Sequence, residues 1–359
     1  MIYRIFLFFL IPRVFFGYNL RKTFSQNQWT THQNKIYLNG NDVNIKGITW
    51  NGLNSDTISF SGLWKHSLEF FMDQLRLQNF NTLLVPFSAE WSYYHRFASP
   101  FHSVISNDFE CINKTSLQIL DLFFEKTLRK NLLVVFQLNR LHKDFLTDVW
   151  FNEPEYNSTV FYDSWFNILD RYRNQKNLFG IDIFNEPYGK ANYRMDSNFS
   201  WSNFCLEFLD TIQDRYPENS WLFFIQGINY GQNYQNNTFN FTGKSYENRI
   251  IFTPHVQDSQ FPKTFTQKTS VDTLFLEWNS NFGFVNQSIM VTKSKSRSTI
   301  WANFLINYLN QKQMNNVFLW EINNDETNGI FLEDWQSFDN TKLSIINTLQ
   351  PNPTHFYLN

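Results

Sequence analysis

Two glutamates stand directly at the ends of short apolar runs. Residues 180–185 read Gly-Ile-Asp-Ile-Phe-Asn and lead into Glu186, and residues 273–276 read Thr-Leu-Phe-Leu and lead into Glu277. Holding a charged carboxylate at the edge of an apolar core costs free energy unless the charge is used. Two carboxyl groups that face one cleft can cleave a glycosidic bond, since one acid protonates the leaving oxygen and the other attacks the anomeric carbon. We therefore predict that Glu186 and Glu277 form a catalytic pair.

Eight apolar runs with amphipathic, helix-like stretches between them must position this pair. Near-continuous apolar strands that alternate with helices indicate a parallel sheet covered on both faces. Eight such units predict a (β/α)8 barrel, in which catalytic residues gather at the carboxyl ends of the strands. A doubly wound open sheet is the alternative, but residues 47–52 lack the glycine-rich turn that usually follows its first strand. The runs are residues 45–50, 82–87, 132–138, 180–185, 222–226, 249–254, 273–277 and 317–321.

The amino-terminal part contains two further signals. Asn39-Gly40 between short alternating runs predicts a β-hairpin ahead of the barrel. Residues 1–18 begin with a charge, continue with an apolar run far shorter than the roughly 20 residues that span a bilayer, and end near a small residue. This pattern predicts a signal peptide and a secreted protein; a buried amino-terminal segment is the alternative. No linker divides residues 19–359, so we expect a single barrel domain there.

Charge and composition exclude several classes of protein. The 359 residues carry 30 Lys and Arg against 32 Asp and Glu, a net charge of −2, which argues against general nucleic-acid binding. The 17% of charged and 42% of hydrophobic residues exclude bulk disorder. The seven His residues are scattered and no phosphate-binding glycine loop is present, so we expect no metal and no cofactor. We also expect a monomer, with no membrane contact once the signal is removed.

Two features bear on the compartment. Cys111 and Cys205 can pair in only one way, so they form either one bridge in an oxidising compartment or two buried apolar residues. Asn-x-Ser/Thr sequences predict a glycoprotein, although an Asn-rich chain also produces them by chance. They start at Asn113, Asn157, Asn198, Asn236, Asn240 and Asn286.

The order and spacing of the motifs resemble those of glycoside hydrolase family 5, of the bacterial secreted endoglucanase type. The resemblance runs from the Asn39-Gly40 hairpin to about Lys342. Each motif is weakly specific by itself, but their order together is strong evidence for the family. The matching segments are residues 47–52, 81–87, 182–187, 252–255, 276–277, 318–323 and 327–330.

The resemblance implies a retaining enzyme that cleaves β-1,4-linked glucan in polysaccharide catabolism, without metal or cofactor. Glu186 would be the general acid/base and Glu277 the nucleophile. Asn185 would hydrogen-bond the sugar 2-hydroxyl, and His255 would belong to the catalytic hydrogen-bond network.

Two tryptophans are candidates for sugar stacking. The resemblance places Trp320 as a platform for the sugar at the cleavage point. A pyranose ring presents a face of C–H groups that an indole can cover. Trp50 is a second candidate for this task, with a plain core residue as the alternative.

The sequence departs from the family pattern at three positions. Leu84 stands where the family has Arg, Asn139 where it has His, and Gln257 where it has Tyr. We retain Asn139 as a candidate substrate-binding residue. The family's Arg and Tyr hold the nucleophile ionised and oriented, so Arg140 or His142 would have to supply replacement charge.

These losses keep a second hypothesis open. The chain would then be a catalytically weakened or inactive pseudo-glycosidase that binds glycan on the same barrel. Retention of both glutamates and of Asn185 favours the enzyme.

Overall fold

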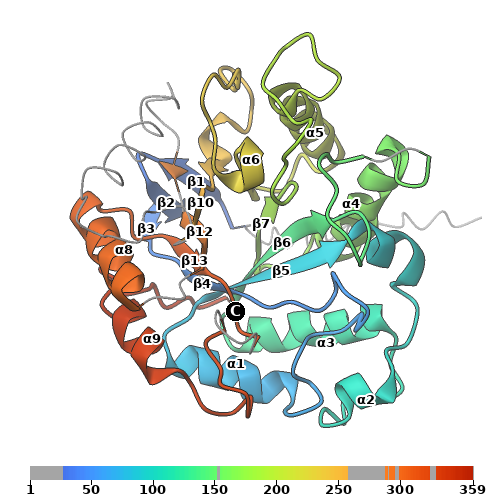
Figure 1. Ribbon diagram of the computed structural model, residues 1–359, viewed down its shortest axis with the longest axis vertical. Helices are drawn as coiled ribbons and strands as arrows, with labels where there is room; N and C mark the ends of the chain where they lie inside the picture. The colour runs from blue at the N-terminus through green and yellow to red at the C-terminus, as the bar shows by residue number, and fades with distance from the viewer. Residues whose placement is uncertain are drawn as a thin grey trace, which may run out of the picture.

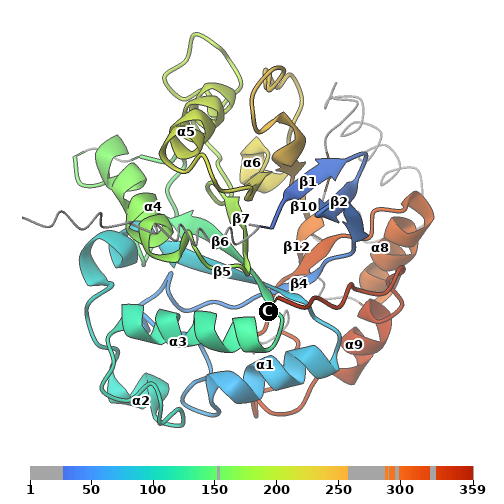
Figure 2. The same cartoon turned by 180° about the vertical axis from the view of Figure 1, so that it is seen from behind.

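Parallel strands arranged in a ring form the centre of the molecule, and helices surround it (Figures 1 and 2). The computed structural model describes residues 27–151, 154–257, 288–289, 291–295, 299–323 and 329–358. The strands of the ring are β4 (Lys46–Thr49), β5 (Thr82–Ser88), β6 (Leu133–Arg140), β7 (Leu178–Asp182), β8 (Leu222–Ile225), β9 (Ile250–Phe252), β10 (His255–Gln257), β11 (Ser288–Ile289), β12 (Val291–Lys295) and β13 (Val317–Leu319).

Strand pairing closes the ring. Each strand from β4 to β8 pairs in parallel with the next strand along the chain, which brings the sheet to β9. β9 then pairs with β11, and β10 pairs with β12. β12 pairs with β13, and β13 pairs with β4, where the ring began. Since β9–β10 and β11–β12 each occupy one place, the ring has eight places, and the predicted (β/α)8 barrel is confirmed. β11 and β12 hold the place between β9–β10 and β13, whereas the predicted strand 273–277 lies outside the described residues.

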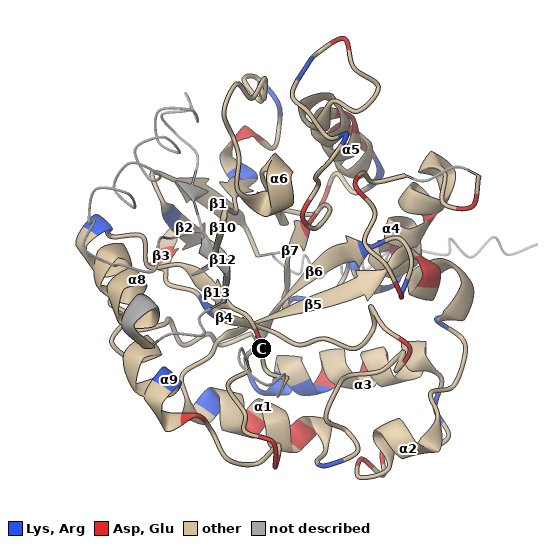
Figure 3. Ribbon diagram, viewed as in Figure 1, with Lys and Arg blue, Asp and Glu red and all other residues tan. Residues whose placement is uncertain are grey.

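Helices cover the outside of the ring, and several of them begin after a capping residue. Ser67, Thr115, Asn157 and Ser200 cap the four long helices of the first half by accepting a hydrogen bond from a backbone N–H of the first turn. Acidic and basic residues are interspersed on α1 and α3 (Figure 3), where Lys130 lies 2.6 Å from both Glu69 and Asp73. The helices are α1 (Leu68–Leu77), α2 (His102–Ile105), α3 (Ser116–Arg129), α4 (Ser158–Tyr172), α5 (Trp201–Arg215), α6 (Ile228–Gly231), α8 (Thr299–Lys312) and α9 (Asn340–Ile346), with shorter turns η1 (Trp91–His95) and η2 (Glu247–Arg249).

No helix within the described ranges is long and apolar enough to cross a membrane.

A small antiparallel sheet precedes the barrel. The predicted hairpin is confirmed as β2 (Lys35–Leu38) and β3 (Asn41–Val43), whose turn places Asn39 and Gly40 at positive φ. The sequence prediction missed β1 (Trp29–His32), which pairs with β2. Trp29 packs edge-on against Phe179 of β7 at 4.7 Å, so this sheet is fastened to the barrel core.

The interior of the ring is apolar at the level of Leu84. Leu84, Val135, Phe224 and Phe318 belong to one buried cluster supplied by strands from around the ring. Phe318 fills the space that a side chain at Gly47 would need, since a Cβ there would lie 2.1 Å from its ring. Leu84 therefore serves as packing inside the barrel.

The two cysteines do not pair. Cys111 and Cys205 are both free thiols, and both are buried. The bridge alternative is wrong, and the two residues serve as small apolar core groups. Burial raises the pKa of both thiols, so neither is a reactive thiolate.

Lys46 is a buried cation at the amino end of β4, and it makes stability depend on pH. Its Nζ donates to the Gln78 carbonyl at 2.8 Å and to Asn347 Oδ1 at 2.6 Å. Burial lowers the pKa of Lys46 to about 8, from 10.5. Between these two values the unfolded chain binds the proton and the folded chain does not, so the free energy of unfolding rises as the pH increases through this window.

We expect the free energy of unfolding of the parent, relative to that of Lys46→Met, to increase by about 2 kcal/mol from pH 7.5 to pH 9.5. Urea unfolding of both proteins at the two pH values measures it. A difference that does not change with pH would mean that Lys46 titrates at its ordinary pKa in the folded protein.

Candidate active site

Glu186 lies just beyond the carboxyl end of β7 and contacts a histidine from the sixth place of the ring. Its backbone is left-handed, with φ +56°, and its side chain is 13% exposed. The Oε1 atom lies 2.9 Å from Nδ1 of His255, the first residue of β10. The structure thus brings together two of the residues that the sequence suggested, and the Glu186 carboxyl keeps limited access to solvent.

A buried aspartate on β7 fixes the backbone of Glu186 through a glutamine. The Glu186 N–H donates to Gln226 Oε1 at 2.7 Å, and Gln226 Nε2 donates to Asp182 Oδ2 at 2.8 Å. The same Asp182 oxygen accepts from Gln137 Nε2 at 2.7 Å. An ionised carboxylate only accepts hydrogen bonds. Asp182 therefore decides which end of the Gln226 amide faces Glu186.

The polar network continues across the top of the ring. Asn139 Nδ2 donates to Gln137 Oε1 at 3.2 Å, and Asn139 Oδ1 accepts from Asn54 Nδ2 at 3.0 Å. Asn54 also reaches Asn51, whose amide donates to the buried Glu321 carboxylate after β13. Together with Asp182 and Gln226, these side chains join five places of the ring, those of β4, β6, β7, β8 and β13.

Arg140 brings positive charge to the Glu186 side of the site. Its Nε donates to Asn139 Oδ1 at 3.0 Å, and one terminal nitrogen donates to the Lys143 carbonyl at 3.1 Å. Burial lowers the pKa of the Arg140 guanidinium, and the carboxylates of Glu186 and Asp144 oppose that shift. The cation at the carboxyl end of β6 therefore interacts electrostatically with Glu186.

Asn185 is buried beside Glu186 and has an acceptor to spare. Its backbone N–H donates to the Leu138 carbonyl at 3.0 Å. Its side-chain Oδ1 is buried and has no hydrogen-bond partner among the described residues. An unsatisfied buried acceptor is costly, so a hydroxyl donor brought by a ligand would relieve the cost.

The two tryptophans are placed differently. Trp320 follows β13 and is half-buried, so the residue is not fully enclosed. Trp50 has no exposed surface, since it packs between Phe60 and Phe71 and donates its indole N–H to the Ser61 carbonyl. A ring without exposed surface cannot cover a sugar. Trp50 is thus a core residue, and its assignment as a stacking platform is wrong.

Asn139 also needs a correction. It is buried, and both its amide oxygen and its amide nitrogen are engaged by Asn54, Gln137 and Arg140. We therefore place it within the supporting network and not against the substrate. Glu277 lies outside the described residues, and Gln257 is described only as part of β10.

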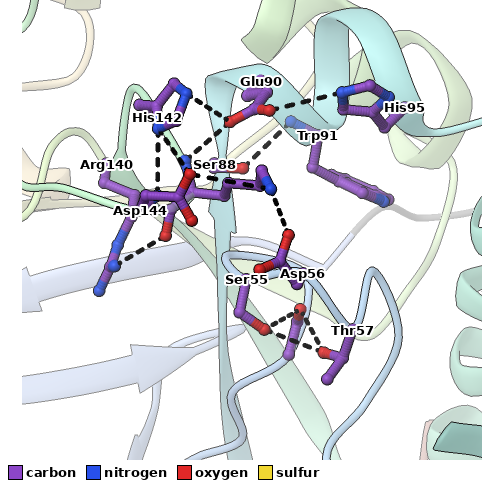
Figure 4. A network of polar contacts seen from close by, with 12 residues as sticks. Ser55, Asp56, Thr57, Ser88, Glu90, Trp91, His95, Arg140, His142 and Asp144 are labelled. Carbon is purple, nitrogen blue, oxygen red and sulfur yellow. Dashed lines mark hydrogen bonds and ion pairs between the residues drawn. The ribbon is translucent and has the colours of Figure 1, made fainter.

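A carboxylate that follows β5 was also missed by the sequence analysis. Glu90 follows β5, is nearly buried, and lies between His95 Nε2 at 3.4 Å and His142 Nε2 at 3.6 Å (Figure 4). It also accepts the Lys143 N–H at 2.8 Å. The only sequence signal was its position two residues after the strand ends. His142 is thus directed to Glu90 and to Asp144.

Within the described ranges, no group of three or more His, Cys, Asp or Glu side chains has an arrangement that could hold a metal ion.

The sequence matches a protein-family model over most of its length. The model is that of Cellulase (glycosyl hydrolase family 5), and it matches residues 37–344. The chain belongs to glycosyl hydrolase family 5. Among similar proteins is an endoglucanase of Paenibacillus polymyxa, 22% identical over 349 residues that cover 88% of this chain and 85% of the relative. The major extracellular endoglucanase of Xanthomonas campestris pv. campestris is 23% identical over 338 residues, covering 86% and 68%.

Solved structures agree with the family 5 fold. The endocellulase from Pyrococcus horikoshii, in a complex with cellotetraose, superimposes with a TM-score of 0.80 at 18% identity, covering 90% of this chain and 99% of that one. The catalytic domain of the Xanthomonas campestris endoglucanase gives a TM-score of 0.75 at 21% identity, covering 87% and 96%. At these identities the likeness concerns the fold.

Proposed function

We propose that this protein is a retaining glycoside hydrolase that cleaves β-1,4-linked glucan, with Glu186 as general acid/base and Glu277 as nucleophile. The observation that carries the proposal is the Glu186 carboxyl, held against His255 at the carboxyl end of a family 5 barrel. Catalytic groups of such barrels gather at this end of the strands.

The reaction follows from these roles in two steps. Glu186 gives its proton to the glycosidic oxygen while the Glu277 carboxylate attacks the anomeric carbon, which breaks the glycosidic bond and forms a glycosyl ester. Glu186, now ionised, takes a proton from water, and the water oxygen displaces Glu277 from the anomeric carbon. The sugar leaves with its original configuration, and no metal or cofactor takes part.

Neighbouring residues support each step. The Oδ1 of Asn185 would accept a hydrogen bond from the sugar 2-hydroxyl, and the half-buried Trp320 would cover the ring at the cleavage point. Arg140 interacts electrostatically with the Glu186 carboxylate, whose negative charge is needed in the second step.

The substrate class is supported by the names of relatives. The Paenibacillus and Xanthomonas relatives are called endoglucanases, and the Pyrococcus structure is a complex of an endocellulase with cellotetraose. None of these names supports the alternative of a glycan-binding protein without turnover.

Secretion, domain organisation and oligomeric state are part of the proposal. We propose that residues 1–18 are removed as a signal peptide and that residues 19–359 act as one monomeric glycoprotein domain outside the cell. The name of the Xanthomonas relative, an extracellular endoglucanase, supports secretion. The amino-terminal segment itself and the sequon at Asn286 lie outside the described residues.

Release of reducing ends from soluble β-1,4-glucan tests the proposed function. We expect release by the parent and none above background by Glu277→Gln, because the nucleophile would be removed. β-1,4-Mannan and β-1,3-glucan serve as comparison substrates. A parent that binds β-1,4-glucan but releases nothing from any of the three would support the binding-protein alternative.

A further inference from the structure

Glu90 is a nearly buried carboxylate that the proposed reaction does not use. Its side chain is 9% exposed, and the Nε2 atoms of His95 and His142 lie 3.4 Å and 3.6 Å away, farther than in a strong hydrogen bond. A backbone donor lies closer, since the Lys143 N–H is 2.8 Å from Oε2. The Glu90 N–H in turn donates to the Leu141 carbonyl at 2.9 Å. Glu90 thus binds the chain just after β6 through both its side chain and its backbone.

Lys143 also binds Arg140, so the backbone of one residue joins Glu90 to the cation of the site. The Lys143 carbonyl accepts from a terminal nitrogen of Arg140 at 3.1 Å, while the Lys143 N–H donates to Glu90. The Nε atom of Arg140 donates to Asn139 Oδ1 at 3.0 Å. An arginine side chain has a large rotamer entropy, so it keeps one position only while such bonds hold it. The position of Arg140 therefore depends on the bond between Glu90 and Lys143.

Arg140 stands near Glu186 because β6 and β7 are neighbours in the ring. The Asn185 N–H donates to the Leu138 carbonyl at 3.0 Å, which aligns the ends of the two strands. Glu186 is the next residue after Asn185, and Arg140 is the second residue after Leu138. Burial lowers the pKa of the Arg140 guanidinium, and the Glu186 carboxylate opposes that shift. A displacement of Arg140 would therefore change the electrostatic potential at the acid/base.

The same loop also lies against the segment that follows the acid/base. The Asp148 carbonyl accepts the Tyr188 N–H at 2.9 Å, and Asp148 Oδ2 accepts the Lys190 N–H at 3.4 Å. Residues 141–148 form neither helix nor strand, so contacts of this kind decide their path. The loop is thus bound to Glu90 near its start and to the catalytic segment near its end.

We propose that Glu90 is a positioning residue: through the Lys143 backbone it holds Arg140 in place beside the acid/base. This inference rests on the proposed function and adds to it a residue that touches no substrate. The role requires a hydrogen-bond acceptor at position 90 and does not require a charge. A glutamine side chain also offers an oxygen to the Lys143 N–H, so Glu90→Gln should keep the arrangement and Glu90→Ala should lose it.

Paired variants separate the acceptor from the charge. Glu90→Ala and Glu90→Gln remove the same charge, but only the glutamine keeps an acceptor. On cellohexaose we expect Glu90→Ala to lower kcat about tenfold and to change KM less than about twofold, because the acid/base and its cation lose their relative position. Glu90→Gln should stay within about twofold of the parent. The control is Asp56→Ala, which removes an exposed carboxylate (73%) that pairs with the Lys143 side chain and not with its backbone; it should match the parent.

A double-mutant cycle tests whether Glu90 acts through Arg140. In the Arg140→Ala background, Glu90→Ala should lower kcat by less than about a further threefold, since the cation that it positions is already gone. Glu186 faces Arg140 and His255, and under the proposed function also Glu277. A carboxyl group that loses a nearby cation keeps its proton to higher pH. The alkaline limb of kcat/KM should therefore move to higher pH in both Glu90→Ala and Arg140→Ala.

A loss in Glu90→Gln as large as in Glu90→Ala, or the full tenfold loss in the Arg140→Ala background, would overturn the positioning role. If Glu90→Ala is unfolded at the assay temperature, Glu90→Asp replaces it, because the shorter side chain keeps the charge and withdraws the acceptor. A parent that does not cleave cellohexaose would overturn the proposed function, and hydrogen exchange of residues 141–148 then decides about Glu90. Faster exchange in Glu90→Ala than in Glu90→Gln supports its role, whereas equal exchange overturns it.

Discussion

Replacing Glu186 with alanine should lower kcat on β-1,4-glucan by about 10³-fold, because the leaving sugar then departs without a proton. The loss should be much smaller for the first step on 2,4-dinitrophenyl β-cellobioside, since a dinitrophenolate leaves without protonation. The second step still lacks its base, so a burst of dinitrophenol followed by slow turnover is expected. Azide should accelerate that turnover and yield the β-configured cellobiosyl azide.

The matched control is Glu218→Ala, which removes an exposed glutamate that follows α5. It should behave like the parent on both substrates. If Glu186→Ala loses activity equally on glucan and on the dinitrophenyl glycoside and azide has no effect, Glu186 is not the acid/base. The position of Glu186 against His255 would then be structural only.

The second large effect is expected at Asp182, which touches no substrate in this account. Asp182→Ala removes the acceptor of the Gln226 and Gln137 amides, so the amide that holds the Glu186 backbone loses its orientation. Misplacement of a catalytic group by about 1 Å can cost about 10²-fold in rate. We expect kcat on glucan to fall by about that factor.

The loss should show the signature of a misplaced acid. It should be larger on glucan, which needs protonation of the leaving group, than on 2,4-dinitrophenyl β-cellobioside, which does not. Asp182→Asn should recover part of the activity, because one amide oxygen in the place of Oδ2 can accept from both glutamines. Equal losses on the two substrates, or thermal unfolding at the assay temperature, would contradict a positioning role and indicate a purely structural one.

The barrel and the placement of Glu186 at its carboxyl end could be predicted because they depend on local pattern. Near-continuous apolar runs mark strands buried on both faces, and Glu186 stands where such a run ends. The Asn39-Gly40 turn likewise needs only neighbouring residues. The short strand β1 escaped prediction because Trp29 to His32 alternates with no turn signal that sets it apart from its surroundings.

The supporting network could not be predicted, because it joins residues that are distant in the sequence. Gln137, Asp182 and Gln226 come from three strands, and each looks like an ordinary polar interruption of an apolar run. In the case of Trp50, residues elsewhere in the sequence remove a role that its position suggested. Its position at a strand end suits a sugar platform, but Phe60 and Phe71 from the following segments enclose it.

Covalent labelling of the nucleophile tests whether Glu277 attacks the anomeric carbon. A 2-deoxy-2-fluoro β-cellobioside with a dinitrophenolate leaving group should form a glycosyl ester that hydrolyses slowly, because fluorine destabilises the cationic transition state of both steps. Peptide mapping by mass spectrometry then identifies the labelled residue. We expect one label per chain, on Glu277, and none in Glu277→Gln. A label on Glu90 or Glu321, or no label on a chain that still cleaves β-1,4-glucan, would contradict it.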